Sequence, residues 1–175
     1  MSNVMGPDTA QEKAAVLEQM VLQYQQMLLR LCYLHLQDRT LAEDAVQETF
    51  VKAYRNLDAF RRESSEKTWL MKIAVNTCRD MHRSGWFRMM DRRLTPDMLP
   101  EATEPYTQRE EELVADVMRL PIKLREVILL YYYQNMNTLE IADTLGLTQA
   151  AVSGRLKRAR EKLRIALEGR KNDEG

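Results

Sequence analysis

An all-α protein of two small helical domains is the architecture indicated by three features of the 175-residue sequence. Apolar residues recur at intervals of three and four along most of the chain, which is the period of an amphipathic helix. Glycine and proline number only 6 and 5, while hydrophobic residues make up 45% and charged residues 30%, a balance typical of a soluble helical protein. An acidic segment with three prolines interrupts this pattern, so residues 92–107 are predicted to be a linker.

Three helices are expected in the first domain, residues 1–91. The first covers about residues 12–36, as one long helix or two short ones. The second begins at the capping-box pair Thr40 and Glu43, and the third follows Ser64 and Ser65. The two expected buried stripes consist of Ala42, Ala45, Val46, Thr49, Phe50, Ala53, Leu57 and Phe60, and of Leu70, Ile73, Ala74, Thr77, Cys78 and Met81. These helices predict a bundle.

Four helices are expected in the second domain, residues 108–170, followed by a tail over residues 171–175. The helices are predicted at about residues 107–119, 122–134, 138–145 and 149–167. Pro121 suits the first turn of a helix, Asn137 with Glu140 caps the third helix, and Thr148 caps the fourth. Gly146 supplies the left-handed residue that a tight turn between the last two helices needs. The last two helices therefore predict a helix-turn-helix.

Charge is distributed unevenly, although 26 basic and 26 acidic residues give a formal net charge of zero. Residues 67–93 carry a net charge of +5, residues 145–170 also carry +5, and residues 94–118 carry −6. The net charge therefore says nothing about a polyanionic partner, whereas the two basic islands favour one.

Other classes of protein are less favoured by the sequence. Two cysteines cannot build a disulfide framework, and no apolar run resembles a signal or a membrane span, so a cytoplasmic protein is expected. No phosphate-binding glycine loop or catalytic motif is recognisable, so neither an enzyme, nor a cofactor, nor a small-molecule substrate is expected. A zinc site from Cys32, His35, Cys78 and His82 is chemically possible, but both cysteines lie on apolar stripes, which favours burial, and no metal is assigned.

The last helix is the candidate DNA-reading element. Val152, Leu156, Ala159 and Leu163 form its apolar stripe, which leaves a basic outer face. Such a helix fits the major groove, about 12 Å wide, with its first side chains on base edges and its flanking cations on phosphates. The alternative is a charged helix that is only solvated. It is disfavoured because the helix-turn-helix signature and the excess of positive charge occur in the same segment.

The third helix of the first domain is a second candidate DNA surface. Lys72, Asn76, Arg79 and Arg83 follow one another at intervals of four, three and four, which aligns them on one polar stripe. Trp69, near the start of this helix, is able to stack on an unpaired base, a contact worth about 1–3 kcal/mol per base in single-strand binders. A lone tryptophan at helical spacing is, however, more often a core residue.

Two stretches of the chain resemble bacterial extracytoplasmic-function (ECF) sigma factors. Residues 43–60 and 68–77 resemble the amino-terminal domain of that family, and residues 120–121, 125–130, 141–142 and 152–163 resemble its carboxy-terminal domain, in the same order. The resemblance covers most of residues 20–168. It implies a sigma factor that binds core RNA polymerase, through a coiled coil of the largest subunit and the flap, and that selects promoter DNA.

The resemblance assigns roles to residues of both domains. It implies that Asp44, Gln47 and Glu48 bind the polymerase coiled coil. Asn76 and its neighbours would hold the opened minus-ten strand, for which the candidate residues are Trp69, Lys72, Asn76, Arg79 and Arg83. The last helix would read the minus-thirty-five element, for which the candidates are Thr148, Ser153, Gly154, Arg155, Lys157, Arg158 and Arg160.

The recognition helix departs from the family pattern at one point. Many members carry Arg or Lys followed by Ser where Ser153 and Gly154 stand, so a long base-reading side chain is missing at position 153. Lys157 or Arg158 is then expected to carry more of the base reading. The resemblance also implies an anti-sigma partner, which nothing in the residues identifies. The alternative function is a stand-alone helix-turn-helix regulator whose first half senses a ligand or dimerises.

Overall fold

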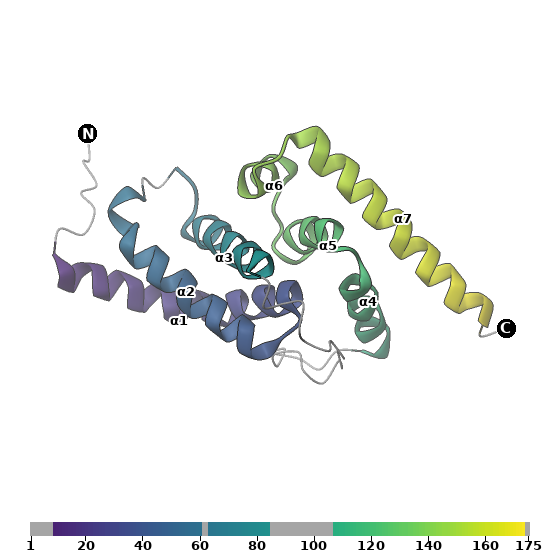
Figure 1. Ribbon diagram of the computed structural model, residues 1–175, viewed down its shortest axis with the longest axis horizontal. Helices are drawn as coiled ribbons and strands as arrows, with labels where there is room; N and C mark the ends of the chain where they lie inside the picture. Colours follow the sequence, from purple (N-terminus) through teal and green to yellow (C-terminus); the bar gives the residue numbers. More distant parts are fainter. Residues whose placement is uncertain (1–8, 61–62, 85–106, 174–175) are drawn as a thin grey trace. The chain divides into compact units, whose positions relative to one another are not determined.

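The structure is a computed structural model that describes residues 9–60, 63–84 and 107–173 (Figure 1). Within these ranges every regular element is helical, which confirms the all-α prediction. The chain divides into two compact units, Met1–Arg92 and Arg93–Gly175. The predicted linker lies outside the described residues except for Thr107, which caps the first helix of the second unit.

The first unit is a bundle of three helices, α1 (Ala10–Leu36), α2 (Arg39–Arg55) and α3 (Glu66–Arg83), with a short 3-10 turn, η1 (Leu57–Ala59). Each of the three helices packs against the other two. Residues 12–36 lie in one long helix rather than two. The predicted stripes of α2 and α3 form the core of the bundle, and only their members Phe60, Ile73 and Met81 are partly exposed.

The start of α2 differs from the prediction. Asp38, not Thr40, is the N-cap, and its carboxylate accepts a hydrogen bond from the Leu41 amide at 2.8 Å. Gln37 ends α1 in the left-handed conformation at φ 59°, so the two helices are separated by only two residues. Asp is among the strongest N-cap residues, and it takes this position ahead of the coincidental Thr40 and Glu43 spacing. The predicted start of α3 is confirmed, because Ser65 caps it through the Thr68 amide at 3.1 Å.

The second unit contains α4 (Gln108–Arg119), α5 (Ile122–Ile128), a π-helix η4 (Leu129–Tyr133), α6 (Thr138–Leu145) and α7 (Gln149–Asp173). Helix α7 packs against α4, α5 and α6, so it is the central element of this unit. The core is formed by fully or nearly fully buried side chains, among them Val127, Leu129, Leu130, Ile141, Val152, Leu156 and Ala159. Helix α7 continues to Asp173, into the segment predicted to be a tail.

The helix predicted over residues 122–134 changes its winding halfway. After Ile128 the chain continues as the π-helix η4, in which the Gln134 amide donates to the Leu129 carbonyl at 3.2 Å, five residues back. Asn135 then adopts a positive φ of 54° and ends the element. Apolar periodicity does not distinguish α from π winding, which is why the sequence predicts one continuous helix here.

A buried ion pair fixes the far end of α7 to α4. The Asp116 side chain is only 3% exposed, and Arg170 donates to its Oδ1 at 2.9 Å and also bonds its Oδ2. Arg119 approaches the same carboxylate at 3.4 Å. The last turns of α7 are therefore part of the folded unit.

Candidate nucleic-acid and polymerase interfaces

The turn between α6 and α7 has the geometry that the sequence predicts for a helix-turn-helix. Gly146 is left-handed at φ 65° and ψ 39°, and the Leu147 amide donates back to the Ala142 carbonyl at 2.9 Å. The cap of α6 by Asn137 and Glu140 is present, and the Thr148 hydroxyl accepts from the Ala151 amide at 3.1 Å. These caps fix the angle at which α7 leaves the turn.

Helix α7 has one buried side and one exposed side, as predicted. Val152, Leu156 and Ala159 of the predicted stripe are buried and Leu163 is partly exposed, whereas Ser153, Lys157 and Arg158 are exposed. A Cβ at Gly154 would have no neighbour within 4 Å, so the start of the exposed side is open. The first two turns of α7 therefore present short side chains, followed by two long cations.

Arg155 lies on the flank of α7 that faces α5. Its side chain is 16% exposed, and its Nη1 lies 3.5 Å from Oε1 of Glu126, a residue of α5 whose side chain is 3% exposed. A buried carboxylate requires a counter-charge, and Arg155 provides it. The structure thus places Arg155 between α7 and the buried Glu126 of α5.

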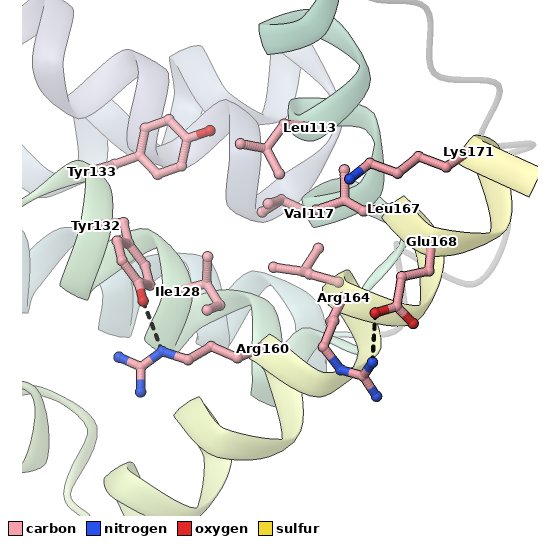
Figure 2. Close-up of a pocket in the computed structure, with 11 residues that line it drawn as sticks. Leu113, Val117, Ile128, Tyr132, Tyr133, Arg160, Arg164, Leu167, Glu168 and Lys171 are labelled. Carbon is pink, nitrogen blue, oxygen red and sulfur yellow. Dashed lines mark hydrogen bonds and ion pairs between the residues drawn. The ribbon is translucent and has the colours of Figure 1, made fainter.

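Arg160 projects toward η4 on the opposite flank of α7. Its Nε donates to the Tyr132 hydroxyl at 2.7 Å (Figure 2). Its guanidinium also lies over the Tyr131 and Tyr132 rings, 5.4 and 5.6 Å from their centroids. A guanidinium over aromatic rings gains cation–π attraction. Arg160 is therefore held at the edge of α7 rather than extended from its outer face.

An apolar groove of about 540 Å³ lies between α4, the α5–η4 segment and α7 (Figure 2). Leu113, Val117, Leu163 and Leu167 supply much of its lining, and Leu113 and Leu167 remain 39% and 37% exposed. Arg160, Arg164 and Lys171 also line it, so cations border the apolar surface. The sequence reasoning missed this groove because its lining residues, from Leu113 to Lys171, are up to 58 residues apart in the chain.

Arg164 neutralises two carboxylates on the exposed part of α7. It bonds Glu161 at 2.6 Å and Glu168 at 2.7 Å. These bonds raise the pKa of the Arg164 guanidinium, and the bond from Arg164 holds the pKa of Glu161 below its usual value. Glu161 and Glu168 are thus paired within α7.

The polar stripe of α3 is accessible along its length. Asn76 and Arg83 are exposed, and Lys72 and Arg79 are partly exposed. Trp69 is also partly exposed and stacks on Phe60, with ring centroids 4.5 Å apart and an interplanar angle of 25°. Since Phe60 covers one face of the indole, only part of that ring remains available to a base.

Helix α2 carries the three candidate polymerase-binding residues on its outer face. Asp44 and Gln47 are exposed and Glu48 is partly exposed. Val51 and Tyr54 are 42% and 37% exposed and follow Gln47 at intervals of four and three, which places them on the same face. The sequence reasoning missed these two exposed apolar residues. A signal was present, because both lie outside the apolar stripe of α2.

Lys52 connects the acidic face of α2 to the polar stripe of α3. Its Nζ donates to the Thr77 hydroxyl at 3.1 Å and lies 4.0 Å from Glu48 and 3.9 Å from Asp80. The charge of Lys52 is therefore shared between one residue of the candidate polymerase face and one beside the candidate DNA stripe.

Three further observations concern the cysteines, the metal-binding groups and the helix hydropathy of the described residues. Cys32 and Cys78 are fully buried, as expected from their positions on apolar stripes. Across residues 9–60, 63–84 and 107–173, no group of three or more His, Cys, Asp or Glu residues is arranged to hold a metal ion. In the same ranges, no helix combines the length and apolar character needed to cross a bilayer.

The turn geometry, the buried side of α7 and its basic exposed side define a helix-turn-helix DNA-binding protein. The class is narrowed by sequence comparison. Residues 20–88 match Sigma-70 region 2, and residues 111–163 match Sigma-70, region 4. The first match covers most of α1 and all of α2 and α3, and the second contains the helix-turn-helix.

Individual relatives agree with these matches. The chain is 30% identical over 158 residues to the ECF RNA polymerase sigma factor SigW of Bacillus subtilis, covering 82% of this chain and 84% of that protein. It is 29% identical to the RNA polymerase sigma-H factor of Pseudomonas aeruginosa, covering 85% and 84% of the two chains. A similar solved structure is CnrH in complex with the cytosolic domain of CnrY, with a TM-score of 0.66 and 29% identity, over 89% of this chain and 90% of that one.

The protein belongs to the ECF family of RNA polymerase sigma factors, which confirms the resemblance noted in the sequence. As such it binds core RNA polymerase and directs promoter-specific initiation of transcription. The matches to both sigma regions do not favour the alternative of a stand-alone helix-turn-helix regulator.

Proposed function

We propose that the two units carry out separate parts of promoter recognition, with a non-enzymatic chain supplying specificity to the polymerase in the cytoplasm. The unit formed by α1–α3 docks on the polymerase and holds the opened minus-ten strand. The unit formed by α4–α7 anchors on duplex DNA at the minus-thirty-five element. The observation that carries this proposal is the pair of separate basic surfaces, on α3 and α7, which belong to different compact units.

The polymerase contact is assigned to the outer face of α2. Asp44, Gln47 and Glu48 supply polar and acidic groups, and the exposed Val51 and Tyr54 add apolar area beside them. An apolar centre with a polar rim is the usual anatomy of a protein–protein interface. The coiled coil of the largest polymerase subunit, implied by the family resemblance, is the proposed partner of this face.

The minus-ten contact is assigned to α3. Asn76 offers an exposed amide that is able to pair with a base edge, and Lys72, Arg79 and Arg83 provide cations for phosphates on the same stripe. Trp69 takes a lesser part, because Phe60 already covers one face of its ring.

The minus-thirty-five contact is assigned to the first half of α7. Lys157 and Arg158 are the long exposed side chains, and Ser153, Gly154 and Thr148 allow close approach of the helix start to the DNA. Arg155 acts through Glu126 as a positioning residue, and Arg160 remains at the flank beside Tyr132.

The apolar groove between α4 and α7 is assigned to the second polymerase contact, the flap. Its exposed leucines need an apolar partner, and the family resemblance implies the flap as a part of the polymerase that this chain binds. An anti-sigma factor is a further proposed partner, supported by the likeness to CnrH, which was solved with the cytosolic domain of another protein.

Holoenzyme assembled from core polymerase and the full chain tests the minus-ten assignment. Asn76→Ala is compared with Gln26→Ala, which removes an exposed amide from α1. Permanganate reactivity of unpaired thymines is expected to fall about fivefold for Asn76→Ala, because the loss of one hydrogen bond costs about 1 kcal/mol. The reactivity is expected to remain unchanged for Gln26→Ala. Equal strand opening by both variants would contradict the assignment.

The groove assignment is tested by Leu167→Asp, which places a charge on its apolar wall. Pull-down of the isolated flap domain by the full chain is expected to weaken, while binding of duplex DNA remains unchanged. Unchanged flap binding would exclude this groove as the docking site.

A further inference from the structure

A second cavity, of about 600 Å³, lies beside the recognition helix on the flank away from Tyr132. It is lined by Pro121, Lys123 and Leu124 at the start of α5 and by four residues of α7: Arg155, Arg158, Glu161 and Lys162. Lys123 lies outside the two helices of the helix-turn-helix, and no sequence motif singled it out. The cavity therefore brings a further cation, Lys123, beside the basic side of α7.

Two of the charged side chains around the cavity are already paired. Arg155 neutralises the buried Glu126, and the Glu161 carboxylate is held by Arg164. In the part of the chain that the structure describes, Lys123 and Lys162 make no ion pair, and Arg158 donates only its Nε to the Gly154 carbonyl at 3.3 Å. Three cationic groups thus remain to bind an external anion.

The position of these cations matches the border of a DNA groove. Arg158 and Lys162 are one helical turn apart on one flank of α7, and Arg160 and Arg164 occupy the other flank. A helix about 10–12 Å in diameter fills a major groove about 12 Å wide, so each flank meets one sugar-phosphate backbone. On the first flank, Lys123 extends the row of cations from α7 to α5.

We propose that Lys123, Arg158 and Lys162 form a phosphate clamp that binds consecutive phosphodiesters of one strand of duplex promoter DNA. The clamp rests on the proposed entry of α7 into the major groove. Duplex DNA is favoured over a free polyphosphate because two of the three cations belong to the same helix as the exposed Ser153 and Lys157, which the same duplex would cover. The contact fixes the register of α7 and carries no sequence information itself. Of the two long exposed side chains at the start of α7, Lys157 is then the one left for base reading.

The test is the salt dependence of binding of the full chain to a labelled duplex of mixed sequence, followed by fluorescence anisotropy. Each lost phosphate contact lowers the slope of log K against log salt by about 0.9. Lys123→Gln and Lys162→Gln are each expected to reduce the slope by about 1. The control is Lys13→Gln, which removes the same charge from α1, where Lys13 pairs with Asp58 and no DNA contact is proposed, and it is expected to leave the slope unchanged.

A slope for Lys123→Gln equal to that of wild type, or a wild-type chain that does not bind duplex at low salt, would overturn the clamp. So would a Lys123→Gln variant that loses affinity for sodium triphosphate but keeps the duplex slope, since the cavity would then be a site for a free polyphosphate. Start-site selection by the wild-type holoenzyme is a separate readout. Its failure contradicts the proposed function, whereas an unchanged slope contradicts the clamp alone.

Discussion

Replacing Arg155 by Met is predicted to destabilise the second unit without removing a DNA contact. Arg155 Nη1 and Glu126 Oε1 are 3.5 Å apart, and the Glu126 side chain is only 3% exposed. Two unit charges at that separation attract by about 5 kcal/mol at an effective dielectric constant of about 20. Much of this attraction offsets the desolvation of the two charges, so the pair itself contributes far less.

Removing one partner is expected to lower the free energy of unfolding by more than the intact pair contributes to it, because the other charge stays buried. Breaking a buried pair in this way costs about 3–5 kcal/mol. We expect a value of about 3 kcal/mol for Arg155→Met, because the guanidinium keeps some contact with solvent. The double variant Arg155→Met with Glu126→Gln removes both charges and retains a hydrogen-bonding amide, so its stability is expected to return to within about 1 kcal/mol of wild type.

Hydrogen exchange in the full chain measures this effect in the second unit alone. A loss of 3 kcal/mol is expected to speed exchange of the protected amides of α5 and α7 about 150-fold in Arg155→Met. The double variant is expected to recover slow exchange and to bind promoter duplex as holoenzyme with wild-type affinity. Recovery of slow exchange with a persistent loss of DNA affinity would refute this reasoning and restore Arg155 as a DNA contact.

Three other predictions concern single features of the two units. Asp44→Ala with Glu48→Ala is expected to reduce affinity for core polymerase while leaving the helicity unchanged, and normal co-purification with polymerase would contradict the α2 assignment. Gly146→Ala is expected to lower the free energy of unfolding of the second unit by about 1–2 kcal/mol, since φ is 65° there, and hydrogen exchange that matches wild type would contradict it. Hydrogen bonds from Thr107 lower the pKa of Glu110 below its ordinary value of 4.5, so this contribution to α4 is complete above pH 4.5 and lost as pH falls through the lowered pKa. Glu110→Gln is expected to remove that part of the acid sensitivity of α4 amide exchange, and an unchanged pH profile would contradict it.

Local chemistry allowed much of the fold to be predicted from the sequence. The bounds of α6, 138–145, follow from the Asn137 cap and the left-handed Gly146, two signals that act within a few residues. The start of α2 was mispredicted because Asp38 and Thr40 both qualify as caps. The choice depends on where α1 ends, and α1 ends at Gln37, a non-glycine residue in a conformation that sequence rarely reveals.

The candidate sites were predictable to a smaller extent. Helical spacing correctly placed Asn76, Lys157 and Arg158 on exposed faces. It also placed Arg155 on a flank, but whether a flanking cation faces solvent or a buried carboxylate depends on Glu126, 29 residues earlier in the chain. The same limit applies to Lys123, whose neighbours in space come from α7. Periodicity within one helix carries no information about such contacts between helices.

Mapping of transcription start sites with purified core polymerase, in the presence and absence of the full chain, tests the central claim most directly. The account predicts that added chain produces discrete start sites downstream of a shared pair of sequence elements, and that Asn76→Ala and Arg158→Ala each weaken initiation at those sites. Start sites that are the same with and without the chain would contradict it.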